Sequence, residues 1–121
     1  VTAVEENVNV KILLMNNNSL GLVHQQQDLF YGQRIFESDF RSKVDFLTIA
    51  KGFGMAAIDL GQCEDPIEAL AQALRQEGPC LIHAPIDVNE KVYPMVAPGA
   101  PNKIMIGGEI DAGWRALGIS K

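Results

Sequence analysis

The residues best suited to chemistry form an amide-rich turn, Asn16-Asn17-Asn18-Ser19, between an apolar run and a helical pattern. The run before it, Val8 to Met15, is rich in branched aliphatic residues, as is typical of a strand buried on both faces. The turn would then follow the carboxyl end of that strand, where open α/β sheets bind ligands and a helix N-terminus offers free N–H groups. Asparagine carbonyl oxygens suit Mg²⁺, which keeps substrate phosphates in its own coordination shell. The turn is therefore a candidate site for a magnesium-bound phosphate ester.

The same residue types also favour a plain structural turn. Asn and Ser are common turn and N-cap residues, and Asn tolerates left-handed backbone angles. On residue types alone, both interpretations of the turn stay open.

A longer ordered set of motifs resembles a known family. The motifs are Asn16-Asn17, Leu20 to Tyr31 (LGLVHQQQDLFY), Asp45-Phe46, Ala50 to Gly54 (AKGFG), Gly78-Pro79, Val92 to Val96 (VYPMV) and Pro98-Gly99. The set resembles the C-terminal, pyrophosphate-binding domain of the thiamine-diphosphate enzymes, and within them the catalytic subunits of acetolactate (acetohydroxyacid) synthases. The ordered set is much more specific than the asparagine pair alone.

The resemblance implies a metal site in the turn. Asn17 would give a side-chain oxygen to Mg²⁺ and Ser19 its backbone carbonyl, while Asn16 would hold the turn together. The family's acidic metal ligand lies in a Gly-Asp-Gly turn, and that sequence does not occur in this chain. Because two oxygens are too few for tight Mg²⁺ binding, we expect the metal to need a further ligand.

The resemblance also implies contacts with the cofactor and substrate. The N–H groups of Leu20 and Gly21 would face the diphosphate, and Leu22 would lie against the reactive ring, although simple core packing of Leu22 is nearly as good an interpretation. Gln26 matches a position in the substrate tunnel that is a tryptophan in many members. We therefore expect weak sensitivity to sulfonylurea-type inhibitors, because an amide lacks the indole's stacking face; otherwise Gln26 is a solvated helix residue.

No residue of the chain is assigned a catalytic role. Thiamine enzymes are activated by the cofactor's own aminopyrimidine, so a proton shuttle through His24 is the weaker hypothesis. His83 lies in an apolar run and is interpreted as a hydrogen-bonded core residue. Asp39, Asp45 and Asp59 are too scattered to predict an acid–base pair.

The resemblance implies a large enzyme of which this chain is a part. Such an enzyme decarboxylates pyruvate and joins the two-carbon unit to a second 2-oxoacid, pyruvate or 2-oxobutyrate, in branched-chain amino acid biosynthesis. It uses thiamine diphosphate and Mg²⁺, with FAD bound outside this segment, and pairs a catalytic-subunit dimer with a small regulatory subunit. The alternatives are another carboligase, decarboxylase or oxidase of the superfamily, and a non-catalytic association module. Alone, the chain is expected to be inactive.

Composition narrows the function classes. The chain has 121 residues, 47% hydrophobic and 21% charged, as expected for one globular domain. Its net charge is −5 with scattered basic residues, which argues against nucleic acid as a partner. It shows neither a membrane-length apolar stretch nor a leader, and Cys63 and Cys80 fit reduced thiols of a cytoplasmic protein.

Alternating strand and helix patterns predict an α/β fold with a parallel sheet and helices on both faces. The first seven residues resemble the end of a helix, so we expect this thiamine-diphosphate-binding fold to be incomplete at its N-terminus. We expect a partial cofactor-binding domain over residues 1–99 and a flexible tail over 100–121. The expected helices are 20–31, 45–51 and one capped by Asp65 with a buried stripe of Ile67, Leu70, Ala71 and Leu74. The expected strands are 8–15, 55–60 and 80–86. Residues 33–43 are expected to form an exposed connection.

Overall fold

The structure is a computed structural model that describes residues 1–107. The chain divides into two compact units, residues 1–89 and 90–121. The domain boundary expected after Gly99 falls within the second unit and stays a prediction. Much of the expected tail, residues 108–121, lies outside the described residues.

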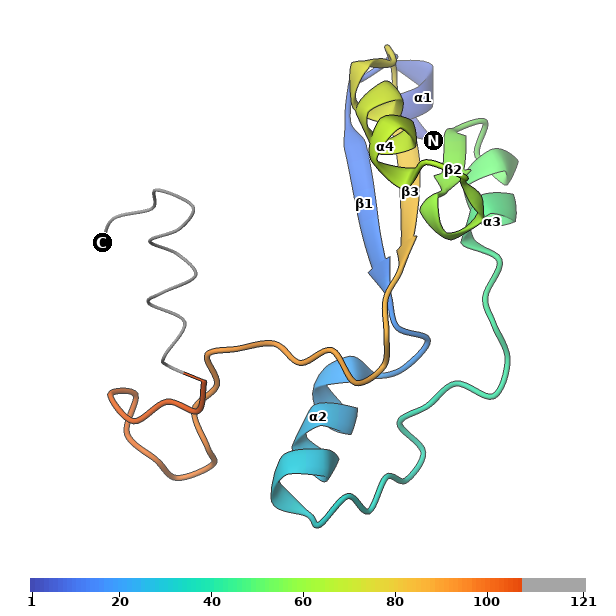
Figure 1. The fold of residues 1–121 in the computed structure, drawn as a ribbon. Coiled ribbons are helices and arrows are strands. Elements are labelled where there is room, and N and C mark those ends of the chain that lie inside the picture. Colours follow the sequence, from blue (N-terminus) through green and yellow to red (C-terminus); the bar gives the residue numbers. More distant parts are fainter. Residues whose placement is uncertain (108–121) are drawn as a thin grey trace. The chain divides into compact units, whose positions relative to one another are not determined.

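The first unit is built on a three-stranded parallel sheet (Figure 1). The strands are β1 (Lys11–Asn16), β2 (Ala56–Asp59) and β3 (Cys80–Pro85), in the order β1-β3-β2. The register places His83 of β3 beside Leu14 of β1 and Asp59 of β2. Because all three strands run in one direction, their carboxyl ends meet at one edge of the sheet. The α/β class and the parallel sheet are confirmed.

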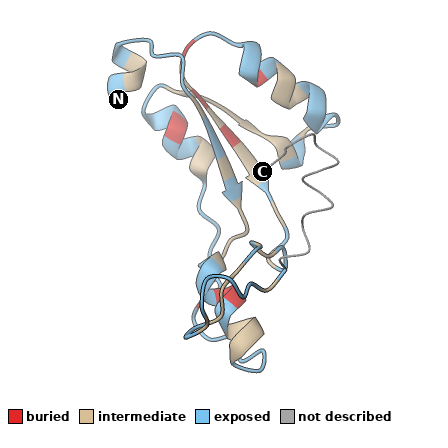
Figure 2. Ribbon diagram, turned by 90° about the vertical axis from the view of Figure 1, so that its left-hand side faces the viewer, coloured by how far each residue is buried: buried red, intermediate tan, exposed pale blue. Residues whose placement is uncertain are grey.

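Helices connect the strands. They are α1 (Thr2–Glu5), α2 (Gly21–Phe30), α3 (Phe46–Gly52), a 3₁₀ turn η1 (Leu60–Gln62) and α4 (Pro66–Arg75). The views in Figures 1 and 2 place α3 and α4 on opposite faces of the sheet. None of the helices within residues 1–107 combines the length and apolar character that a membrane crossing needs.

The N-terminal caps follow the sequence signals. The Asp65 carboxylate accepts hydrogen bonds from the N–H groups of Ile67 and Glu68 at 3.1 and 3.0 Å, and Pro66 occupies the first turn of α4. Asp45 caps α3 in the same way through Thr48 N, at 2.9 Å. Local capping chemistry therefore fixes where both helices begin.

The core of this unit is small. Ala73, Cys80 and Ile82 form it, with Ala56, Ile58, Leu60 and Leu70 packed around them. Figure 2 accordingly shows few buried positions and much exposed ribbon. Cys80 is buried, and both cysteines are free thiols, as expected.

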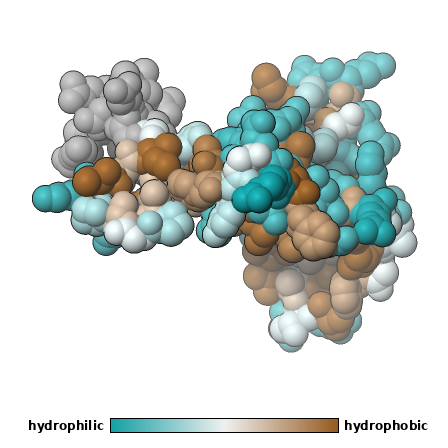
Figure 3. Space-filling model, turned by 90° about the horizontal axis from the view of Figure 1, so that it is seen from below, coloured by the Kyte–Doolittle hydropathy of each residue, from teal (hydrophilic) through white to brown (hydrophobic). Residues whose placement is uncertain are grey.

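Several apolar residues expected inside lie at the surface. Leu13 and Met15 of β1 are 51% and 56% exposed, because β1 is an edge strand that no described element covers. Ile67 and Leu74 of α4 are also exposed, since the helix packs through Ala73 and Leu70 instead. Apolar side chains are visible on the surface in Figure 3. The expected burial of β1 on both faces is therefore wrong for the described residues. In the expected stripe of α4, burial is wrong for Ile67 and Leu74, whereas Leu70 packs against the core.

The second unit contains one pair of short extended segments among its described residues. Met95 and Ile106 exchange backbone hydrogen bonds of 3.0 and 2.7 Å. This pairing closes residues 95–106 into a loop.

Candidate functional site

The amide turn is held together by its own side chains. Asn16 Oδ1 accepts a hydrogen bond from Asn18 N at 2.9 Å, and Asn17 Oδ1 accepts one from Ser19 N at 3.1 Å. Asn18 has a φ of 54°, which Asn tolerates better than most residues. Two overlapping Asx turns therefore form the link between β1 and α2.

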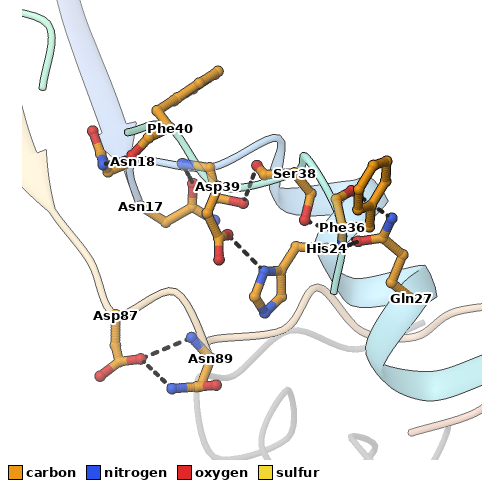
Figure 4. Close-up of polar contacts among 11 residues, drawn as sticks. Asn17, Asn18, His24, Gln27, Phe36, Ser38, Asp39, Phe40, Asp87 and Asn89 are labelled. Atoms are coloured by element: carbon orange, nitrogen blue, oxygen red, sulfur yellow. Dashed lines mark hydrogen bonds and ion pairs between the residues drawn. The ribbon is translucent and has the colours of Figure 1, made fainter. Parts of the chain in front are cut away.

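A distant segment, residues 36–40, holds the turn from one side (Figure 4), and we call it the clasp. Leu20 N donates to Ser38 O at 2.7 Å and Phe40 N donates to Asn18 O at 3.0 Å. These two bonds flank an antiparallel bridge between Ser19 and Asp39. The expectation of an exposed connection over 33–43 is confirmed except at Ser38, which is fully buried where the clasp pairs with the turn.

This pairing sets the direction of the Ser19 backbone. In an antiparallel pair flanked in this way, the opposed residues point their own N–H and C=O groups away from each other. The Ser19 N–H indeed points to Asn17 Oδ1, and the carbonyl of an extended residue lies on the same side as its N–H. The two oxygens expected to bind metal, on Asn17 and Ser19, therefore face one side of the turn.

The side chain of Gln27 in α2 forms hydrogen bonds with the clasp. Gln27 Nε2 donates to Phe36 O at 2.9 Å, while its Oε1 accepts from Phe36 N at 3.1 Å and from Ser38 Oγ at 2.9 Å. Figure 4 shows this side chain reaching from the helix to the clasp. The Gln27 amide thus pairs with the backbone N–H and C=O of Phe36 as a neighbouring strand would.

His24 joins the same assembly. Its Nδ1 lies 2.8 Å from Asp39 Oδ1, and the residue is only 8% exposed. The hydrogen bond from His24 holds the pKa of the Asp39 carboxyl below its usual value. His24 is therefore fixed against the clasp, and its role as a proton shuttle stays a hypothesis.

The start of α2 brings Gly21 beside the turn, but the expectation for Leu20 is wrong: its N–H, expected to face the diphosphate, donates to Ser38 O at 2.7 Å instead. Gly21 is the first residue of the helix, Leu20 is its N-cap, and a Cβ on Gly21 would lie 2.6 Å from Asn17 Nδ2. Leu22 is 61% exposed. Its side chain is therefore not part of the core of the described residues, and its contact with the cofactor ring stays a prediction.

Gln26 faces a cavity of about 440 Å³ along α2. Val23, Gln27, Tyr31 and Arg34 form the rest of its lining. The arrangement leaves Gln26 exposed beside apolar and cationic neighbours, so a substrate contact at this position stays a prediction.

A second cavity, of about 590 Å³, opens at the carboxyl ends of the three strands. Asn16 and Asn17 line it from β1 and the turn, Asp59 from the end of β2 and His83 from β3. No local pattern marks Asp59 or His83 as part of this site, because they are 43 and 67 residues from Asn16 and only the sheet register brings them together.

His83 connects the strands at this cavity. Its Nε2 lies 3.0 Å from Asn16 Nδ2. Its Nδ1 lies 3.1 Å from Asp59 Oδ1, but the direction is not that of a hydrogen bond, so this buried nitrogen has no hydrogen-bond partner among the described residues. Burial raises the pKa of the Asp59 carboxyl, whereas the nearby His83 ring and the hydrogen bonds from Gly61 N and Gln62 Nε2 lower it by more, so the net shift is downward. The expectation of a hydrogen-bonded core residue therefore holds for His83 Nε2 and not for Nδ1.

The donor set of the turn fits part of a magnesium site. Asn17 Oδ1 and the Ser19 carbonyl are hard oxygen donors on one side, next to the N-terminus of a ten-residue helix. Within residues 1–107 no three His, Cys, Asp or Glu side chains gather as metal ligands would. The described residues can therefore supply two of the ligands of such an ion.

Comparisons with known proteins identify the family of the chain. Residues 1–84 match the family model of the thiamine pyrophosphate enzymes' C-terminal TPP-binding domain. The chain is 52% identical over 106 residues to the acetolactate synthase isozyme 1 large subunit of Escherichia coli, covering 88% of this chain and 19% of that protein. It is 38% identical over 97 residues to the acetolactate synthase isozyme 2 large subunit of that organism, covering 80% of this chain and 18% of that protein. It is 39% identical over 99 residues to the acetolactate synthase large subunit of Pyropia yezoensis, covering 81% of this chain and 17% of that protein.

The chain thus spans about a fifth of the length of these relatives. The matched family covers β1, the turn, α2 and nearly all of the sheet. The chain belongs to the family of C-terminal TPP-binding domains of thiamine pyrophosphate enzymes.

Proposed function

We propose that this chain is the part of an acetolactate synthase large subunit that holds the metal-bound diphosphate of thiamine diphosphate. The observation that carries the proposal is that Asn17 Oδ1 and the Ser19 backbone face one side of the turn at the start of α2. The similarity to three acetolactate synthase large subunits supports the choice of enzyme.

In the proposed site, Asn17 and Ser19 hold Mg²⁺ together with a ligand from outside this chain. The free N–H groups at the start of α2 bind the diphosphate, and Gly21 lets the backbone approach because it carries no Cβ. Thiamine diphosphate, when bound, supplies the electron sink for 2-oxoacid chemistry. The chain's own work is to anchor and orient that group, with Leu22 against the ring and Gln26 beside the second substrate.

The complete enzyme would join two 2-oxoacids, pyruvate with pyruvate or with 2-oxobutyrate. Because the relatives are named large subunits, we propose a small regulatory subunit as a partner. We further propose a dimer of catalytic subunits in the cytoplasm, with FAD bound outside this segment.

A chimera tests the proposal: this chain replaces the matching segment of the Escherichia coli isozyme 1 large subunit. Purified chimera is supplied with pyruvate, with and without 2-oxobutyrate, and the products are identified. We expect acetolactate and acetohydroxybutyrate, formed only with both thiamine diphosphate and Mg²⁺, and no product from the 121-residue chain alone. A folded chimera that lacks cofactor-dependent activity, or that yields only aldehyde or oxidised acid, would contradict the assignment.

A further inference from the structure

The hydrogen-bond pattern of the turn assigns an orientation to the Asn16 amide. Its Oδ1 accepts from the backbone N–H of Asn18 at 2.9 Å, and a backbone N–H can only donate. The other end of the amide is therefore the NH₂ group. That group lies 3.0 Å from His83 Nε2.

This orientation in turn assigns the His83 tautomer. An NH₂ group donates, so Nε2 must accept, and an accepting Nε2 in a neutral imidazole leaves the proton on Nδ1. That nitrogen lies 3.1 Å from Asp59 Oδ1, close enough for an ion pair although off the direction of a hydrogen bond, and the two side chains are 13% and 14% exposed. A carboxylate acceptor favours a proton on the nitrogen beside it.

Asp59 is itself fixed in place. Its Oδ1 accepts from Gly61 N at 2.9 Å and its Oδ2 from Gln62 Nε2 at 3.0 Å. Asp59, His83 and Asn16 thus form a chain of polar contacts across the three strands, and it ends in the Asx turn of the proposed metal site.

We propose that His83 and Asp59 are positioning residues for the Mg²⁺ ligands of this site. They act through Asn16: the ring accepts from its NH₂ group, which holds its Oδ1 on Asn18 N and keeps Asn17 and Ser19 aimed to one side. The inference rests on the proposed function and adds the outer groups that orient the ligands. Groups of this kind commonly alter metal affinity by 10- to 100-fold when removed.

The test compares two substitutions of similar size in the chimera. His83→Gln can still accept from Asn16 and donate to Asp59, whereas His83→Leu can do neither. The measured quantity is the Mg²⁺ concentration for half-maximal activity, with kcat at saturating Mg²⁺ as the second readout. We expect His83→Leu to need about tenfold or more Mg²⁺ with kcat nearly unchanged, and His83→Gln to stay within about threefold of the parent.

A second variant pair keeps the test decisive if His83→Leu does not fold. Asp59→Ala removes both acceptor oxygens near Nδ1, while Asp65→Ala removes the carboxylate that caps α4. In the 121-residue chain, ¹⁵N NMR of the His83 ring reports its tautomer. We expect the proton on Nδ1 in the parent and Asp65→Ala, and on Nε2 in Asp59→Ala, with faster hydrogen exchange at Asn18 N.

The outcomes separate the two claims. A parent chimera without Mg²⁺-dependent activity would overturn the proposed function. A Mg²⁺-dependent parent in which His83→Leu and His83→Gln need the same Mg²⁺ concentration would overturn the positioning role alone. A parent ring protonated on Nε2 would do so as well.

Discussion

Gly21 lies directly beneath the amide of Asn17: a Cβ at Gly21 would stand 2.6 Å from Asn17 Nδ2. Real Cβ atoms do not come so close to another heavy atom. The first residue of α2 and the expected metal ligand therefore constrain each other.

Gly21→Ala should displace the Asn17 amide. In the chimera we expect about tenfold more Mg²⁺ for half-maximal activity, because the ligand oxygen moves with the amide. Gly52→Ala is the matched control, since a Cβ at Gly52 meets nothing within 4 Å and Ala favours the helix. Equal Mg²⁺ requirements for the two variants would show that the close approach does not matter.

Gln27→Glu should loosen the clasp. The carboxylate still accepts from Phe36 N and Ser38 Oγ, but it loses the donor to Phe36 O and sets an oxygen against that carbonyl. We expect a loss of about 1–3 kcal/mol in the free energy of unfolding. Urea titration of the 121-residue chain measures it.

The neighbouring Gln26→Glu makes the same chemical change on the exposed side of α2. It should alter the free energy of unfolding by less than about 0.5 kcal/mol. If both variants unfold at the same urea concentration, the clasp contributes nothing to stability.

Thr48→Val should raise the pKa of Asp45 toward its ordinary value. The largest cause of the lowered pKa is the hydrogen bond from Thr48 Oγ1, 2.6 Å from Asp45 Oδ2. A carboxyl with a depressed pKa in the folded chain stabilises it above the pKa of the unfolded chain, and loses this effect as pH falls through the folded pKa. Thr48→Val should therefore lose less stability on acidification than the parent.

The pKa of Asp45 is read from the pH dependence of its side-chain NMR signal. Thr48→Ser, which keeps the hydroxyl, should retain the depressed pKa. If Asp45 has the same pKa in Thr48→Val as in Thr48→Ser, the Thr48 hydroxyl is not the cause of the lowered pKa.

Cys63 should react with iodoacetamide much faster than Cys80 in the folded chain. Cys80 is 2% exposed and burial raises the pKa of its thiol, which lowers the thiolate fraction. Cys63 is partly exposed. Peptide mass spectrometry gives both rates, which should converge in urea; fast native labelling of Cys80 would contradict its place in the core.

The sequence predicted what depends on neighbours along the chain. The cap at Asp65, and the link from strand to amide turn to α2, are set by local hydrogen bonds and periodicity. The family resemblance rested on the same continuous stretch, and the comparisons support it.

The contacts that could not be predicted from the sequence join residues that are far apart along the chain. The burial of Ser38 and the pairing of residues 36–40 with the turn depend on Gln27, and no periodicity marks them. His83 meets Asn16 and Asp59 only through the register of parallel strands. The apolar run predicts a buried β1, but the burial of a strand depends on what packs on its faces, and Leu13 and Met15 lie on a face that the described residues leave exposed.

The most direct test of the central claim is the Mg²⁺ requirement of the chimera with Asn17→Ala, compared with Asn18→Gly. Gly fits the positive φ of Asn18, so that control removes an amide from the turn without backbone strain. The account predicts at least about a tenfold rise in the Mg²⁺ needed by Asn17→Ala and little change in Asn18→Gly. An Asn17→Ala chimera with the parent's Mg²⁺ requirement would contradict it.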